Sequence, residues 1–230
     1  MMPAFVRYAV ASAAIVASLV AEATAQSANV ARAADTKHGA TIAAQGTPGG
    51  APGCAQCHAF NGASDGSGAF PRIAGQSAYY LSKQLRDFRS GQRDNAVMTP
   101  IAKAMTAEDI DDVAAYYAGL HSPVLPLAKP DTALIKQGEQ LANVGDEGRG
   151  LQACDNCHGP GGAGEAPAIP YLAGQYAPYI AMELRMWQRG FRKSSPNGMA
   201  FVSKQLTDSD IAAVAAYYQQ VLGAGELAGR

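Results

Sequence analysis

The sequence has few cysteines, few histidines and almost no net charge. Its 230 residues include four Cys and four His, and the formal net charge is −1. A nucleic-acid-binding protein normally carries a basic stripe, so this balance argues against nucleic acid as a partner. Aromatic residues are sparse at 7%, whereas Gly (25) and Pro (13) are plentiful. We therefore expect long loops between the elements of the fold.

Long apolar runs are also lacking, except for one near the start of the chain. Residues 8–21 are apolar but too few to span a bilayer comfortably. Arg7 precedes them and the small residues "ATA" (23–25) follow, which is typical of a secretory signal peptide. We expect residues 1–25 to be removed during export, leaving a soluble protein. A retained membrane anchor is the alternative, and N-terminal sequencing of the mature protein would distinguish the two.

All four cysteines fall in two copies of one pattern. They read "CAQCH" at 54–58 and "CDNCH" at 154–158, so a His follows each Cys-x-x-Cys pair at once. An exported protein could use four cysteines for two disulfides. A disulfide framework gives no reason for a His to recur at that place, so the spacing argues against disulfides.

The chain is an internal repeat with an offset of about 100 residues. For example, "FPRIAGQSAYYLSKQL" (70–85) matches "IPYLAGQYAPYIAMEL" (169–184). A repeat of this length is a whole small domain, and the proline-rich stretch "HSPVLPLAKP" is the natural linker. We therefore divide the chain into a signal peptide (1–25), an N-terminal domain (26–120), a linker (121–130) and a C-terminal domain (131–230).

Each domain is predicted to be all-α. Residues 77–91 show helical apolar spacing and stop at Gly91, and 177–190 are their equivalent. Thr106 and Thr207 each open a further helix with a capping-box pattern. Short helices are expected before the first Cys of each motif, and no convincing strand pattern is present. Three helices form a thin core, which a large buried cofactor would stabilise.

The Cys-x-x-Cys-His pattern is typical of covalent haem attachment. Two cysteines three residues apart can add to the two vinyl groups of haem, and the adjacent His then lies under the iron. A zinc site would need two more ligands per motif, and neither repeat has another cysteine. A thioredoxin-like pair would need a βαβ context, which is absent. We therefore predict two covalently bound haem c groups, attached to Cys54, Cys57, Cys154 and Cys157, with His58 and His158 as iron ligands.

Methionine recurs where a second axial ligand is needed. Met98 and Met199 each stand eight residues before the capping Thr of the last helix. Met105 aligns with Leu206 and is expected in the core. We predict Met98 and Met199 as iron ligands; the alternative is that both only pack. Two protein ligands would fill both axial positions, and the soft thioether favours ferrous iron, as suits a one-electron carrier.

The remaining histidines do not recur. His38 aligns with Gln137, and His121 lies in the predicted linker. We expect both on the solvated surface.

Pro71 and Pro170 lie at equivalent places after the two haem motifs. A proline carbonyl can accept a hydrogen bond from the second ring nitrogen of the axial His and fix its tautomer. The alternative, that these prolines only shape the loop, is compatible with this role.

The ordered set of motifs resembles cytochrome c4, which has two tandem class I cytochrome c domains. The match covers about residues 37–221 and includes "P-x-[IL]-A-G-Q" and "T-x-x-D-I-x-x-V-A-A-Y-Y". The resemblance implies a periplasmic di-haem electron-transfer protein, with the Met and Pro roles given above. It also implies that the N-terminal helix crosses the last helix at Gly39, against Tyr116 or Tyr117. Gly138 against Tyr217 or Tyr218 would be the second crossing.

Several electron-transfer roles remain open. The leading hypothesis is a shuttle from a membrane quinol-oxidising complex to a terminal oxidase or reductase, with any membrane contact made through a partner. A dehydrogenase is the donor in the runner-up hypothesis. The alternatives are the di-haem subunit of a dehydrogenase complex and, less favoured, a di-haem peroxidase, which would need a displaceable iron ligand. The basic clusters 89–94 and 188–193 are expected as solvated helix ends, with haem propionates or an acidic partner as further candidates. Asp155 in the second motif predicts a lower potential for the C-terminal haem.

Overall fold

The computed structural model of the chain describes residues 32–122 and 131–221, called here the N-terminal half and the C-terminal half. The predicted signal peptide (1–25) and residues 123–130 of the predicted linker lie outside the described residues. Within the two halves, no helix is both long and apolar enough to cross a membrane.

Both halves are helical, as predicted, and the described residues form only isolated β-bridges in place of strands. Each half has more helices than the three expected, because the haem motif and the predicted Met ligand each lie on a short helix. Such helices of four to six residues are too short to show a periodic pattern. The N-terminal half contains α2 (Thr36–Gln45), α3 (Ala55–His58), α4 (Ala78–Ser90), α5 (Met98–Lys103) and α6 (Ala107–Ala118). The C-terminal half contains α7 (Thr132–Asn143), α8 (Asp155–His158), α9 (Ala177–Gln188), α10 (Met199–Ser203) and α11 (Asp208–Gln220), with 3₁₀ turns at Glu147–Arg149 and Pro160–Gly162.

The helix ends follow the local sequence signals. Thr106 accepts a hydrogen bond from the Asp109 backbone N–H, and the Asp109 side chain accepts one from the Thr106 N–H. Thr207 begins α11 with the same capping box. Gly91 ends α4 in the left-handed conformation, with φ of 78°. These signals fix where the long helices start and stop.

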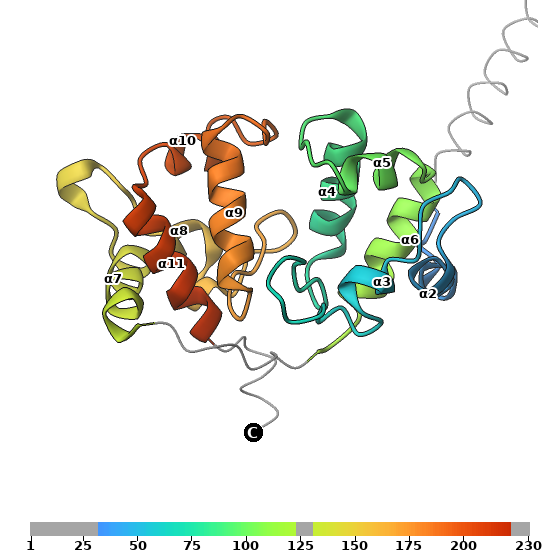
Figure 1. Ribbon diagram of the computed structural model, residues 1–230, viewed down its shortest axis with the longest axis horizontal. Helices are drawn as coiled ribbons and strands as arrows, with labels where there is room; N and C mark the ends of the chain where they lie inside the picture. Colours follow the sequence, from blue (N-terminus) through green and yellow to red (C-terminus); the bar gives the residue numbers. More distant parts are fainter. Residues whose placement is uncertain (1–31, 123–130, 222–230) are drawn as a thin grey trace, which may run out of the picture. The chain divides into compact units, whose positions relative to one another are not determined.

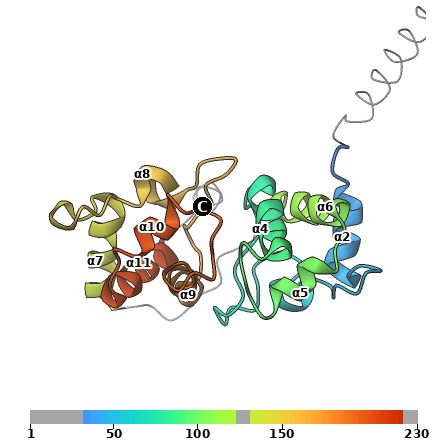
Figure 2. The same ribbon diagram turned by 90° about the horizontal axis from the view of Figure 1, so that it is seen from above.

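The first helix of each half packs against the last one, α2 on α6 and α7 on α11 (Figures 1 and 2). A Cβ on Gly39 would lie 2.2 Å from the Asp112 carbonyl oxygen and 2.8 Å from the Tyr116 Cβ. On Gly138 it would lie 2.1 Å from the Ala213 carbonyl oxygen and 2.7 Å from the Tyr217 Cβ. Only glycine permits this approach, so the predicted crossings are present, against Tyr116 and Tyr217.

Each half has its own hydrophobic core. Ile42, Ile110, Val113 and Tyr117 belong to the N-terminal core, together with Met105, which is 3% exposed. The core position expected for Met105 is therefore correct. The C-terminal core contains the equivalent set Leu141, Leu206, Ile211, Val214 and Tyr218. The domain boundaries themselves stay predictions.

Candidate functional site

Each Cys-x-x-Cys-His motif forms one helical turn, α3 or α8, with the first Cys directly before it and the His at its end. The next residue turns the chain sharply, with φ of 59° at Ala59 and 73° at Gly159. Both conformations lie in the region that favours glycine. The helical turn of α3 or α8 therefore places both cysteines and the His of each motif close together on one short element.

The two motif histidines are buried and similarly held. His58 is 9% exposed, and its Nδ1 lies 3.1 Å from the Pro71 carbonyl oxygen. His158 is 7% exposed, and its Nδ1 lies 2.9 Å from the Pro170 carbonyl oxygen. A carbonyl can only accept, so each Nδ1 carries the proton and each Nε2 keeps a lone pair. Burial also lowers the pKa of both imidazoles, which favours the neutral form that can bind iron.

None of the four cysteines forms a disulfide. Burial raises the pKa of Cys54 and of Cys154 to about 11, so both are neutral thiols at physiological pH. Cys57 is half-buried and Cys157 is exposed. The four cysteine sulfurs are therefore available to form thioether bonds with a prosthetic group.

Met98 and Met199 occupy the same structural position, the first residue of α5 and of α10. Both side chains are half-buried. Each backbone N–H is held by a preceding side chain, through Asn95 Oδ1 at 2.9 Å and Ser195 Oγ at 3.2 Å. Met199 also packs against the core that Cys154 contacts. The two predicted Met ligands are therefore structurally equivalent.

His38 lies at the surface, as expected, but it also contacts a buried carboxylate. Its Nδ1 lies 2.8 Å from Oδ2 of Asp112, which is fully buried, and its own side chain is 41% exposed. The hydrogen bond to Asp112 raises the pKa of His38. The α2–α6 crossing therefore carries a polar contact that single-residue reasoning missed. His121 is exposed, as expected.

The residues present fit covalent haem. Thiols and a neutral imidazole nitrogen are the required donors, and both sets occur twice. Among the described residues, the buried Nε1 of Trp187 and Nε of Arg192 have no hydrogen-bond partner. Two such donors suit the anionic carboxylates of a haem, so the C-terminal half fits the group on this ground as well.

Arg93 and Arg192, from the two basic clusters, are not solvated, contrary to expectation. They are 5% and 4% exposed and lie opposite each other in a bridge between the two halves. Both donate to Glu183 of α9, at 2.5 and 2.7 Å, and both donate to Gln84 of α4. Burial opposes ionisation of Glu183, but the two guanidinium groups outweigh it and lower the pKa. One carboxylate therefore joins the two repeats.

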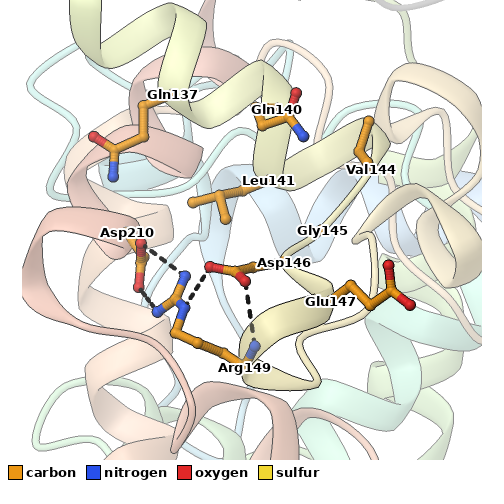
Figure 3. Close-up of a pocket in the computed structure, with 9 residues that line it drawn as sticks. All are labelled: Gln137, Gln140, Leu141, Val144, Gly145, Asp146, Glu147, Arg149 and Asp210. Atoms are coloured by element: carbon orange, nitrogen blue, oxygen red, sulfur yellow. Dashed lines mark hydrogen bonds and ion pairs between the residues drawn. The ribbon is translucent and has the colours of Figure 1, made fainter.

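A surface pocket in the C-terminal half lies between α7, the 3₁₀ turn at Glu147–Arg149 and the start of α11 (Figure 3). Arg149 crosses it and contacts Asp146 at 2.6 Å and Asp210 at 2.7 Å. These ion pairs attach the loop before the second haem motif to the capping box of α11. Neither motif histidine lines the pocket.

The glutamines of the "AGQ" motif, Gln76 and Gln175, are not among the predicted site residues. Both are buried and recur at the repeat offset. A polar residue that recurs at the repeat offset, outside the capping boxes and the haem motifs, is the sequence signal that indicates these two glutamines.

Two helical units, each presenting a haem-attachment motif with a buried neutral His, define a di-haem c-type electron-transfer cytochrome. The family model described as "Cytochrome c" matches residues 36–120. The one described as "Cytochrome C oxidase, cbb3-type, subunit III" matches residues 146–217. Both halves of the chain thus match cytochrome c models independently.

Individual relatives specify the family. "Cytochrome c4" of Thiocapsa roseopersicina is 40% identical over 72% of this chain and 85% of its own length. The structure of reduced recombinant cytochrome c4 from Pseudomonas stutzeri has a TM-score of 0.71 at 32% identity, covering 82% of this chain and 100% of that one. "Thiosulfate dehydrogenase electron acceptor" of Stutzerimonas stutzeri is 39% identical over 73% of this chain and 78% of its own length. The chain belongs to the di-haem cytochrome c4 family, and it carries two covalently bound haem c groups.

Proposed function

We propose that the chain is a periplasmic electron carrier in which each haem has one His and one Met as axial ligands. The ligands are His58 with Met98 and His158 with Met199. The thioether bonds come from Cys54 and Cys57 in the N-terminal half and from Cys154 and Cys157 in the C-terminal half.

The observation that carries this proposal is the paired environment of His58 and His158. Each is buried, neutral and fixed by a proline carbonyl, so its Nε2 is presented in a single orientation. Met98 and Met199, at equivalent helix starts, supply a second ligand of equal kind. A haem held on both sides exchanges one electron and leaves no position for substrate. We therefore assign the chain no enzymatic turnover of its own.

The electron donor is proposed to be a dehydrogenase. A relative of 39% identity is named "Thiosulfate dehydrogenase electron acceptor", which supports an oxidoreductase of inorganic sulfur compounds as donor here too. A terminal oxidase or reductase would accept the electrons. A quinol-oxidising complex is the other candidate donor.

Haem attachment can be tested with Cys57→Ser, with Cys157→Ser as the matched variant in the other repeat. The wild type should carry two haems by mass and keep its colour on the protein after acid–acetone extraction. Each variant should lose one thioether in its own half only. One haem per wild-type chain, or colour that leaves with the solvent, contradicts the assignment.

The donor and the enzymatic alternative need separate assays. Stopped-flow reduction by a purified thiosulfate dehydrogenase should be faster than reduction by a quinol-oxidising complex, and the opposite order favours the second donor. Size exclusion of periplasmic extract separates a free carrier from a complex subunit. Peroxide turnover by the purified protein would support a peroxidase and contradict our assignment.

A further inference from the structure

The glutamine of each "AGQ" motif reaches across to the other half. The Arg72 backbone N–H donates to Gln175 Oε1 at 2.9 Å, and Gln175 Nε2 donates to the Arg72 carbonyl at 2.8 Å. Gln76 makes the same pair with Tyr171, at 3.3 and 3.4 Å. Arg72 and Tyr171 occupy equivalent places in the repeat. The contact is therefore reciprocal, with each half clamping one residue of its partner.

The clamped residue directly follows the proline that holds the motif His. The N–H of Arg72 and the carbonyl of Pro71 belong to one peptide group. That carbonyl accepts from His58 Nδ1, while that N–H donates to Gln175. A single peptide group thus connects a glutamine of the C-terminal half with the imidazole of the N-terminal half.

The other half repeats this connection. The peptide group of Pro170 and Tyr171 accepts from His158 Nδ1 at 2.9 Å and donates to Gln76 Oε1. Gln76 and Gln175 are 6% and 5% exposed, so water competes little with these contacts. Neighbouring contacts fix the approach of the two halves, since Ser77 Oγ donates to the Pro167 carbonyl at 2.6 Å and the Tyr176 hydroxyl donates to the Ala63 carbonyl.

A peptide group whose N–H donates a hydrogen bond has a more negative carbonyl oxygen, because hydrogen bonds in series polarise one another. A stronger acceptor at Nδ1–H makes the imidazole a more basic metal ligand. A more basic ligand favours ferric iron and lowers the reduction potential. The glutamine therefore acts on the iron through one peptide and one imidazole.

We propose that Gln175 and Gln76 are positioning residues that each tune the axial His of the opposite half, coupling the two haem potentials crosswise. This inference rests on the proposed ligation by His58 and His158. The shorter contacts at Arg72 make Gln175 the stronger of the two. The tandem arrangement thereby sets the potentials as well as the spacing of the halves.

The test compares Gln175→Met and Gln76→Met, which change the side-chain volume little. Each removes both hydrogen bonds to the other half and the one that the glutamine accepts from the N–H of the next residue. Gln188→Met is the control, because Gln188 donates to the Ser203 and Leu206 carbonyls within its own half. Redox titration is followed by NMR, with the Met98 and Met199 methyl signals identifying the haems. The His Nδ1 proton shift reports the hydrogen bond directly.

Gln175→Met should raise the N-terminal potential and move the His58 Nδ1 proton upfield, with a smaller change at the C-terminal haem. Gln76→Met should do the reverse to a lesser extent, and Gln188→Met should give no crossed shift. Gln175→Glu keeps an acceptor for the Arg72 N–H, so it should return the N-terminal potential to the wild-type value or below. It also provides the decisive measurement if Gln175→Met does not fold.

Two outcomes in Gln175→Met would overturn the proposed crosswise coupling. One is an equal shift in the potentials of both haems, and the other is a shift confined to the haem of the mutated half. The proposal would also be contradicted if the N-terminal potential rose in Gln175→Glu as it does in Gln175→Met. Failure of the underlying ligation looks different, because the wild type itself would then lack Met methyl signals characteristic of iron-bound sulfur.

Discussion

The two halves place the predicted iron ligands in equivalent positions, and they differ in the residues around them. Both have a His held by a proline carbonyl, a Met at a helix start and a glycine at the helix crossing. The differences lie in residues next to these contacts. Ala59 stands where the C-terminal half has Gly159, and Ala55 stands where it has Asp155.

The electrostatic partners differ as well. His38 and Asp112 form a hydrogen bond at the α2–α6 crossing, where the other half has Gln137 and Ala213. In the contact between the halves, Glu183 is charged and its repeat equivalent Gln84 is neutral. The placement of the predicted ligands is therefore common to both repeats, while backbone strain and local charge distinguish them.

The largest expected effect comes from substituting the glycine at the helix crossing, which both halves share. Gly39→Ala and Gly138→Ala would each place a methyl group within 2.2 Å of a backbone carbonyl oxygen of the last helix. The helices must separate, which should cost roughly 3 kcal/mol in either half. Denaturant unfolding of the two variants should show similar losses in free energy of unfolding. Gly119→Ala is the control, since its nearest neighbour would lie at 3.6 Å. A loss of stability in only one of the two variants would contradict the structural equivalence of the halves.

The next prediction uses the residue after each motif His. Ala59 has φ of 59° and ψ of 161°, a region that side chains rarely occupy. Ala59→Gly should therefore stabilise the N-terminal half by about 1 kcal/mol, and Gly159→Ala should destabilise the C-terminal half by about 1–3 kcal/mol. Thermal unfolding followed by the absorbance of each haem measures both. Destabilisation by Ala59→Gly would show that the turn carries no strain.

Asp155 distinguishes the two haem environments by charge. It is half-buried and accepts hydrogen bonds from the Tyr218 hydroxyl at 2.8 Å and the Gly161 N–H at 2.7 Å. A fixed carboxylate favours the ferric state, so the C-terminal haem should have the lower potential. Asp155→Asn should raise that potential by on the order of 1 kcal/mol, or roughly 40 mV for one electron.

Tyr218→Phe is the companion variant, because it keeps the charge and removes one of its hydrogen bonds. It should shift the C-terminal potential less than Asp155→Asn does. A single redox wave in the wild type, unchanged by Asp155→Asn, would remove this distinction between the halves.

The smallest effect is a pH dependence confined to the N-terminal half. The hydrogen bond to Asp112 raises the folded-state pKa of His38, and Asp109 and Glu108 add to the rise. The resulting stabilisation is complete below the unfolded value near 6.5 and is lost as pH rises through the higher folded value. His38→Gln, which copies Gln137, should abolish this pH dependence in unfolding experiments. A stability that instead increases across that pH range in the wild type contradicts the sign.

Sequence patterns predicted the parts of the fold that local chemistry determines. The capping Thr residues and the stop at Gly91 follow from interactions within a helix. The glycine crossings, in contrast, were implied by the resemblance to cytochrome c4. The sequence did not show that Arg93 and Arg192 are buried, because their shared partner Glu183 lies in the contact between the repeats. The same holds for Gln76 and Gln175, whose hydrogen-bond partners in the other half are backbone groups with no sequence signature.

The central claim, that both irons have one His and one Met ligand, is tested most directly by the sulfur-to-iron absorption band near the red end of the visible spectrum. Met98→Ala and Met199→Ala should each remove about half of the band and lower one of the two potentials, because each variant loses one thioether ligand. The double variant should lose the band entirely. Met105→Ala, a core variant, should leave it intact. Retention of the full band in Met98→Ala or Met199→Ala, or its loss in Met105→Ala, would contradict the account.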